Sequence, residues 1–146
     1  MDRQLQKIIK KCRKNDRQAQ FDLYHYCFDY LLAICFRYQR QREDAVSLLN
    51  DAFLKILLSI DSFDASKEFK PWAATITVRT AIDQFRSEQK YKEATDLKEH
   101  DAELEEVQLS PKHLEVLDGL SADDVRELVF ALPEKERMVF VLYEWE

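Results

Sequence analysis

The stretch from Phe69 to Lys92, FKPWAATITVRTAIDQFRSEQKYK, contains no helix-breaking residue after its proline. Pro71 stands near its beginning, where a helix tolerates proline because the missing N–H would have no intrahelical partner. The stretch can therefore fold as one long helix, against which the rest of the chain must pack. The 146 residues include a single Gly and 3 Pro, so there is little material for hairpins or tight turns.

At about 100° per residue, the side chains of this stretch separate into two faces. The face expected to be buried is apolar and consists of Ala74, Val78, Ala81, Ile82 and Phe85. The opposite face mixes an aromatic ring with cations and consists of Trp72, Ile76, Arg79, Asp83, Arg86 and Lys90. Single-stranded nucleic acid requires this combination, with cations for the phosphates and a flat ring for an unstacked base. The alternative is that Trp72 fills the core and the cations are only solvated; spacing alone leaves both interpretations open.

Apolar periodicity predicts three further helices before this stretch, over the first dozen residues, from about Asp16 to Tyr38 and from about Glu43 to Ile60. Asn15 or Asp16 is expected to cap the second helix. The stripe of that helix is Leu23, Cys27, Tyr30, Leu31, Ile34, Cys35 and Tyr38, widened by Tyr24, Tyr26, Phe28 and Phe36. The third helix has the stripe Ala45, Leu48, Leu49, Ala52, Phe53, Ile56, Leu57 and Ile60.

The net charge of the chain changes sign at about Glu93. Residues 1–92 carry 17 Lys and Arg against 12 Asp and Glu, a net charge of +5, whereas residues 93–146 carry 5 against 16, a net charge of −11. We interpret this as a basic domain followed by an acidic linker. Ser121 is then expected to cap a short helix, and Pro133 to be the first residue of another. The residues of the former expected to face inward are Val125, Leu128, Val129 and Leu132.

Together these patterns predict an all-α fold, with a compact bundle of about four helices, an acidic linker and two short C-terminal helices. Cys12, Cys27 and Cys35 are odd in number and lack Cys-x-x-Cys spacing, so we expect buried thiols rather than disulfides or a zinc site. No nucleophile–base pair or glycine-rich phosphate loop is recognisable, so neither catalysis nor a cofactor or metal is expected. The absence of a signal peptide or transmembrane run predicts a cytoplasmic protein without membrane insertion.

Three segments, in this order, resemble region 2 of bacterial extracytoplasmic-function sigma factors, the domain that binds core polymerase and melts promoters. They lie within residues 14–90 and read NDRQAQFDLYHYCFDYLLAICFRY, REDAVSLLNDAFLKI and FKPWAATITVRTAIDQFR. Residues 120–146 resemble the start of region 4 of such factors. The resemblance implies a region 2-like domain over 1–92, a linker over 93–119 and an incomplete region 4 over 120–146.

The function that this resemblance implies is transcription initiation, through RNA polymerase core and the melted minus-ten element of a promoter. In the family, the third helix docks on a coiled coil of the largest polymerase subunit; here this implies Asp44, Leu48, Leu49, Asn50, Asp51 and Phe53. The following loop and the long helix hold the single-stranded minus-ten element; here this implies Lys67, Phe69, Lys70, Trp72, Thr75, Ile76, Arg79, Asp83, Arg86 and Lys90. An anti-sigma factor is a further partner that the resemblance suggests.

Three positions depart from the family pattern. Ser47 stands where the family usually has Asp, Asn50 where it has Gln, and Arg79 where it has Asn. Asn can both donate to and accept from a base edge, whereas Arg only donates and adds charge. These departures motivate an alternative function, that of a degenerate sigma-like helical module that binds polymerase or an anti-sigma partner without opening DNA.

Overall fold

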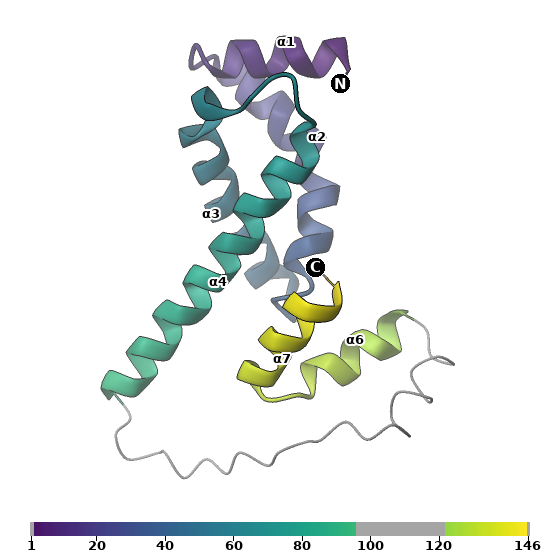
Figure 1. Ribbon diagram of the computed structural model, residues 1–146, viewed down its shortest axis with the longest axis vertical. Coiled ribbons are helices and arrows are strands. Elements are labelled where there is room, and N and C mark those ends of the chain that lie inside the picture. The colour runs from purple at the N-terminus through teal and green to yellow at the C-terminus, as the bar shows by residue number, and fades with distance from the viewer. Residues whose placement is uncertain (1, 96–121, 146) are drawn as a thin grey trace. The chain divides into compact units, whose positions relative to one another are not determined.

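The computed structural model describes residues 2–95 and 122–145, and no strand occurs within these ranges. Its elements are α1 (Arg3–Cys12), α2 (Arg17–Cys35), α3 (Arg42–Leu58), the 3₁₀ turn η1 (Ile60–Ser62), α4 (Phe69–Thr95), α6 (Ala122–Phe130), α7 (Glu134–Phe140) and the π-helical turn η2 (Val141–Trp145). The chain divides into two compact units, Met1–Gln89 and Lys90–Glu146. The predicted all-α class is confirmed (Figure 1).

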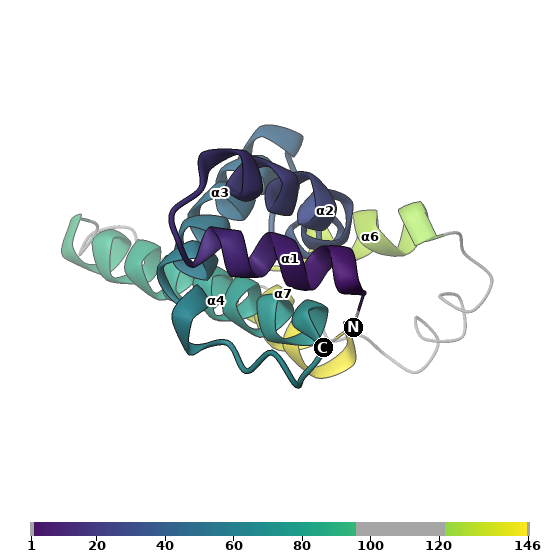
Figure 2. The ribbon, with the colours of Figure 1, turned by 90° about the horizontal axis from the view of Figure 1, so that it is seen from above.

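In the first unit, α1 lies across one end of the bundle formed by α2, α3 and the first part of α4 (Figures 1 and 2). Aspartates begin the first two helices. Asp2 accepts a hydrogen bond from the N–H of Gln4 at 3.1 Å, and Asp16 accepts one from the N–H of Ala19 at 3.1 Å. Asp16 is therefore the cap of α2, and Asn15 takes φ 61°, a left-handed conformation that asparagine adopts more readily than most residues.

The apolar stripes predicted for the second and third helices form the core of this unit. The buried residues of α2 and the turn after it include Leu23, Cys27, Leu31, Ile34, Cys35 and Tyr38. Those of α3 and η1 are Ala45, Leu48, Leu49, Ala52, Phe53, Ile56 and Ile60, with Leu57 half-buried. The predicted burial of Tyr26 and Tyr30 is wrong, since they are 40% and 37% exposed. The ammonium group of Lys70 lies over both rings, 5.5 and 5.4 Å from their centres.

The buried stripe of α4 is rotated from the predicted one. Its buried residues are Phe69, Ala73, Thr77, Thr80 and Ala81, whereas Ala74, Val78, Ile82 and Phe85 are half-buried. Two threonines enter the core because each hydroxyl donates to a carbonyl one turn earlier. Thr77 Oγ1 lies 2.9 Å from the oxygen of Ala73, and Thr80 Oγ1 lies 2.7 Å from that of Ile76. Buried hydroxyls satisfied in this way leave no unpaired polar group, so the stripe need not be wholly apolar.

The second unit contains α6, α7 and η2. Its buried side chains are Val129 and Phe130 of α6, Leu132 between the helices, Met138 of α7 and Val141 of η2. The guanidinium groups of Arg126 and Arg137 lie 4.8 and 4.9 Å from the centre of the Phe130 ring. Leu128 was predicted to face inward but is 46% exposed. Pro133 stands at the N-cap of α7, one position before the helix, rather than within its first turn.

Two sequence predictions fall outside the described residues, namely the cap at Ser121 and most of the acidic linker. Thr95 is the last residue of α4, so the first residues of the predicted linker continue that helix. In the two described ranges, each helix is too short or too polar to span a bilayer.

The three cysteines are buried in the first unit and unpaired, as predicted. Burial raises the pKa of Cys12 to about 11 and the pKa of both Cys27 and Cys35 to about 12, from an ordinary value of 9.0. Asp16 and Asp22 add a smaller upward effect on the pKa of Cys12. The reactive form of a cysteine is its thiolate, so these side chains are protonated and unreactive in the native fold near neutral pH.

We therefore expect iodoacetamide to label all three cysteines slowly in the native chain and rapidly in urea at about pH 8. Mass spectrometry of labelling time courses checks this expectation, and equal native and denatured rates would contradict it.

The stability of the fold should also depend on alkaline pH. As the pH rises above 9.0, the unfolded chain loses thiol protons before the folded chain does. The free energy of unfolding should therefore fall as the pH rises from 9.0 to between about 11 and 12.

Candidate nucleic-acid interface

The beginning of α4 carries a cluster of three aromatic rings. The ring centre of Phe63 lies 5.5 Å from that of Phe69 and 4.9 Å from that of Trp72, and Phe69 lies 5.7 Å from Trp72. Phe63 and Phe69 are buried, with 3% and 1% of their surface exposed, whereas Trp72 is half-buried. The indole is therefore held against two buried rings while part of its surface stays accessible. Phe69, predicted to contact DNA, is a core residue in this fold.

The loop between η1 and α4 is held by a residue far away in the sequence. Arg13, at the end of α1, donates from Nε to the carbonyl oxygen of Ile60 at 3.2 Å and from Nη2 to that of Phe63. The Asp64 carboxylate accepts from the N–H of Ser66 at 2.9 Å and from its hydroxyl at 2.7 Å. These bonds from Ser66 hold the pKa of the Asp64 carboxyl below its usual range. The loop thus has a defined shape, with Lys67 exposed on it.

The predicted cation row continues along the exposed side of α4. Arg79, Arg86 and Lys90 are exposed. Among the described residues, neither Arg79 nor Arg86 has an ion pair or hydrogen-bond partner for its side chain. Thr75 is exposed, with its hydroxyl donating to the carbonyl of Pro71, and Ile76 is half-buried. Within residues 2–95 and 122–145, both guanidinium groups therefore remain available to bind an anion.

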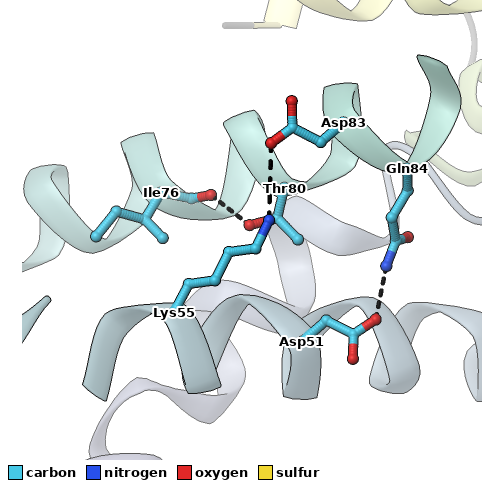
Figure 3. A network of polar contacts seen from close by, with 6 residues as sticks. All are labelled: Asp51, Lys55, Ile76, Thr80, Asp83 and Gln84. Carbon is cyan, nitrogen blue, oxygen red and sulfur yellow. Dashed lines mark hydrogen bonds and ion pairs between the residues drawn. The ribbon is translucent and has the colours of Figure 1, made fainter. Parts of the chain in front are cut away.

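Asp83, also predicted in this row, is engaged with α3 instead. Its carboxylate lies 3.7 Å from Lys55 Nζ, and both side chains are largely exposed (Figure 3). The next residue of α4, Gln84, donates from Nε2 to Asp51 Oδ2 at 2.7 Å, and Asp51 lies one turn before Lys55 on α3. These two contacts join the middle of α4 to α3. Lys55 partly offsets the negative charge of Asp83, so Asp83 repels an anion bound at this row less than an unpaired aspartate would.

The predicted polymerase-docking residues of α3 separate into exposed and buried sets. Asp44, Asn50 and Asp51 are exposed. Leu48 and Leu49 are 1% and 0% exposed, and Phe53 is 8% exposed, so these three form core contacts and cannot present a docking surface in this fold. Asn50 Oδ1 accepts from the hydroxyl of Tyr24 at 2.7 Å. The amide of Asn50 and the carboxylate of Asp51 are therefore each oriented by a neighbouring helix.

A family model for sigma-70 region 2 matches residues 23–91, from the first turns of α2 to near the end of α4. The chain is also 27% identical to the ECF RNA polymerase sigma factor SigW of Bacillus subtilis, over 97% of this chain and 79% of that protein. The chain is therefore similar to extracytoplasmic-function sigma factors, with a sigma-70 region 2 match over residues 23–91. It is also 24% identical to the RNA polymerase sigma factor YlaC of Bacillus subtilis, over 89% of this chain and 74% of the relative.

A third relative is the RNA polymerase sigma-H factor of Pseudomonas aeruginosa, 24% identical over 97% of this chain and 76% of the relative. The matched region contains the aromatic cluster, the cation row and the exposed face of α3. Sequence reasoning missed the residues that orient this region, namely Arg13, Tyr24 and Gln84. Each acts on a residue 26 to 50 positions away, and no local pattern indicates such a pair.

Proposed function

We propose that this chain is an extracytoplasmic-function sigma factor and that it binds RNA polymerase core through the exposed residues of α3. We further propose that it holds the unpaired strand of a promoter minus-ten element on α4 and the loop before it. The observation that carries the proposal is the arrangement along α4, where a supported, half-exposed indole is followed by two free guanidinium groups. Trp72 supplies a stacking surface, and Arg79 and Arg86 supply charge for phosphates.

The mechanism is binding rather than bond chemistry. Each phosphate that the protein neutralises releases condensed counterions, which favours binding at low salt. Stacking of a base on an aromatic side chain contributes about 1–3 kcal/mol. Stacking requires an unpaired base, so the indole surface favours the open strand over the duplex and lowers the free energy of the melted promoter. The loop restrained by Arg13 adds a wall of fixed shape beside this surface.

The test uses a fluorescein-labelled single-stranded minus-ten oligonucleotide and the full chain, by fluorescence anisotropy at several salt concentrations. We expect Arg79→Ala and Arg86→Ala each to weaken binding about fivefold at low salt, as for the loss of about 1 kcal/mol. Each should also reduce the slope of log affinity against log salt by about 0.7, the loss of one phosphate contact on a single strand.

Lys10→Ala is the matched control, because Lys10 is an exposed cation on α1, outside the proposed interface. Equal affinities and slopes for all four proteins would overturn the DNA role of α4. Retained binding to polymerase core in the same proteins would then support the second candidate, an interaction module that does not open DNA. The observation that favours this candidate is Arg79 itself, which lacks the acceptor that an Asn would offer to a base edge.

A further inference from the structure

A second aromatic and cationic group lies on a different side of the first unit. Tyr26 and Tyr30 of α2 are 40% and 37% exposed, although the same helix supplies much of the core. The ammonium group of Lys70, in the first turn of α4, lies 5.5 Å from the ring centre of Tyr26 and 5.4 Å from that of Tyr30. We call these three residues the tyrosine–lysine patch.

The geometry of the patch fixes a cation between two flat surfaces. Tyr26 and Tyr30 are four positions apart, so their side chains are neighbours on the surface of α2. A cation over an aromatic face is attracted by the negative potential of the ring. Among the described residues, Lys70 has no carboxylate partner, and neither tyrosine hydroxyl has a hydrogen-bond partner. The patch therefore offers a held positive charge, exposed ring surface and two free hydroxyl groups.

The tyrosine–lysine patch is separate from the row that contains Trp72 and Arg79. Two residues along a helix differ by about 200°, so Lys70 and Trp72 point about 160° apart around α4. Lys67 is exposed on the loop directly before α4, and it is close in sequence to both Lys70 and Trp72.

We infer that the tyrosine–lysine patch is a further nucleotide-binding subsite for the single strand, an inference that rests on the proposed function. Lys70 binds a backbone phosphate, and the exposed ring surface of Tyr26 and Tyr30 stacks the adjoining base. The chemistry of the patch favours this occupant, because a nucleotide combines the negative charge and the flat ring that complement it. The base must be unpaired, since only then is its face available.

One acid lies close to the tyrosine–lysine patch in sequence. Asp29 is exposed on α2, between the two tyrosines along the chain, and it forms no ion pair with Lys70 among the described contacts. Its negative charge opposes a bound phosphate. The subsite therefore predicts that removal of the Asp29 charge strengthens DNA binding. We expect Asp29→Asn to raise the affinity for single-stranded DNA about twofold, as for surface charges that interact at a few tenths of a kcal/mol.

The experiment measures binding of the full chain to a fluorescein-labelled single-stranded oligonucleotide by anisotropy. The double variant Tyr26→Leu with Tyr30→Leu removes both rings and should weaken binding about tenfold, the loss of one stacked base. The double variant Tyr26→Phe with Tyr30→Phe keeps the rings and should retain most of the affinity. Phe21→Leu is the control, because Phe21 is a 58% exposed ring on the same helix that contacts His25 rather than Lys70.

The outcomes separate this inference from the proposed function. Binding that Arg79→Ala weakens but the leucine double variant does not would overturn the subsite alone, and so would equal losses in the leucine variant and Phe21→Leu. No oligonucleotide binding by the unchanged chain would overturn both. If circular dichroism shows that the leucine variant loses helix, the Lys70→Gln variant tests the subsite through the salt dependence of its DNA binding. It should reduce the salt slope by about 0.7, and an unchanged slope would overturn the subsite.

Discussion

Replacing Phe69 by Ala is expected to lower the free energy of unfolding of the first unit by about 3–5 kcal/mol. The side chain is 1% exposed and packs against Phe63 and Trp72 at the beginning of α4. Its removal leaves a cavity that these rings cannot fill, because the loop that carries Phe63 is held in place by Arg13. The loss is a large fraction of the stability that a small domain has in total.

Urea unfolding followed by circular dichroism at several wavelengths measures the effect. Leu58→Ala is the control, since Leu58 is 77% exposed on α3 and its truncation should change the free energy by less than about 0.5 kcal/mol. Phe69→Leu keeps most of the buried volume and should bind single-stranded DNA as tightly as the unchanged chain. If the Phe69→Ala protein is as stable as the unchanged chain but no longer binds DNA, Phe69 acts in the DNA interface rather than in the core.

Helix positions were predictable because apolar spacing along each segment reports directly on the buried side of a helix. The stripes of α2 and α3 were found in this way, apart from Tyr26 and Tyr30. The face of α4 was misplaced because Thr77 and Thr80 satisfy their hydroxyls within the helix and so behave as small core residues. A rule that counts only apolar side chains assigns such threonines to the surface and rotates the predicted face.

The candidate site was predictable in composition but not in arrangement. The mixture of an indole with cations on one helix can be seen in the sequence, and Arg79 and Arg86 are indeed exposed. Which of the remaining residues are accessible depends on pairs that are distant in the chain. The ion pair of Asp83 with Lys55 joins α4 to α3, and no spacing rule predicts it. Core leucines such as Leu48 also share a segment with the residues proposed to dock on polymerase, so the family motif alone does not separate the two sets.

Reversing the charge of Asp51 is expected to weaken binding to RNA polymerase core by roughly a hundredfold, which corresponds to about 3 kcal/mol. Asp51 is exposed on α3, and Gln84 holds its carboxylate by a hydrogen bond of 2.7 Å. A carboxylate already oriented by its own fold loses little side-chain entropy when it meets a cation of a partner. Asp51→Arg replaces that attraction with repulsion, whereas the fold should tolerate the change because the side chain lies at the surface.

Titration of a fluorescently labelled chain with core polymerase measures this affinity, and Asp61→Arg is the matched control. Asp61 is an exposed carboxylate on η1, outside the proposed docking surface, and its reversal changes the net charge by the same amount. Equal losses in both variants would show that only overall charge matters and would contradict a docking role for α3.

Gln84→Ala keeps the charge of Asp51 and removes the hydrogen bond that orients its carboxylate. It should weaken binding by about threefold, close to the contribution of one exposed hydrogen bond. A loss as large as that of Asp51→Arg would instead place the main contact on α4.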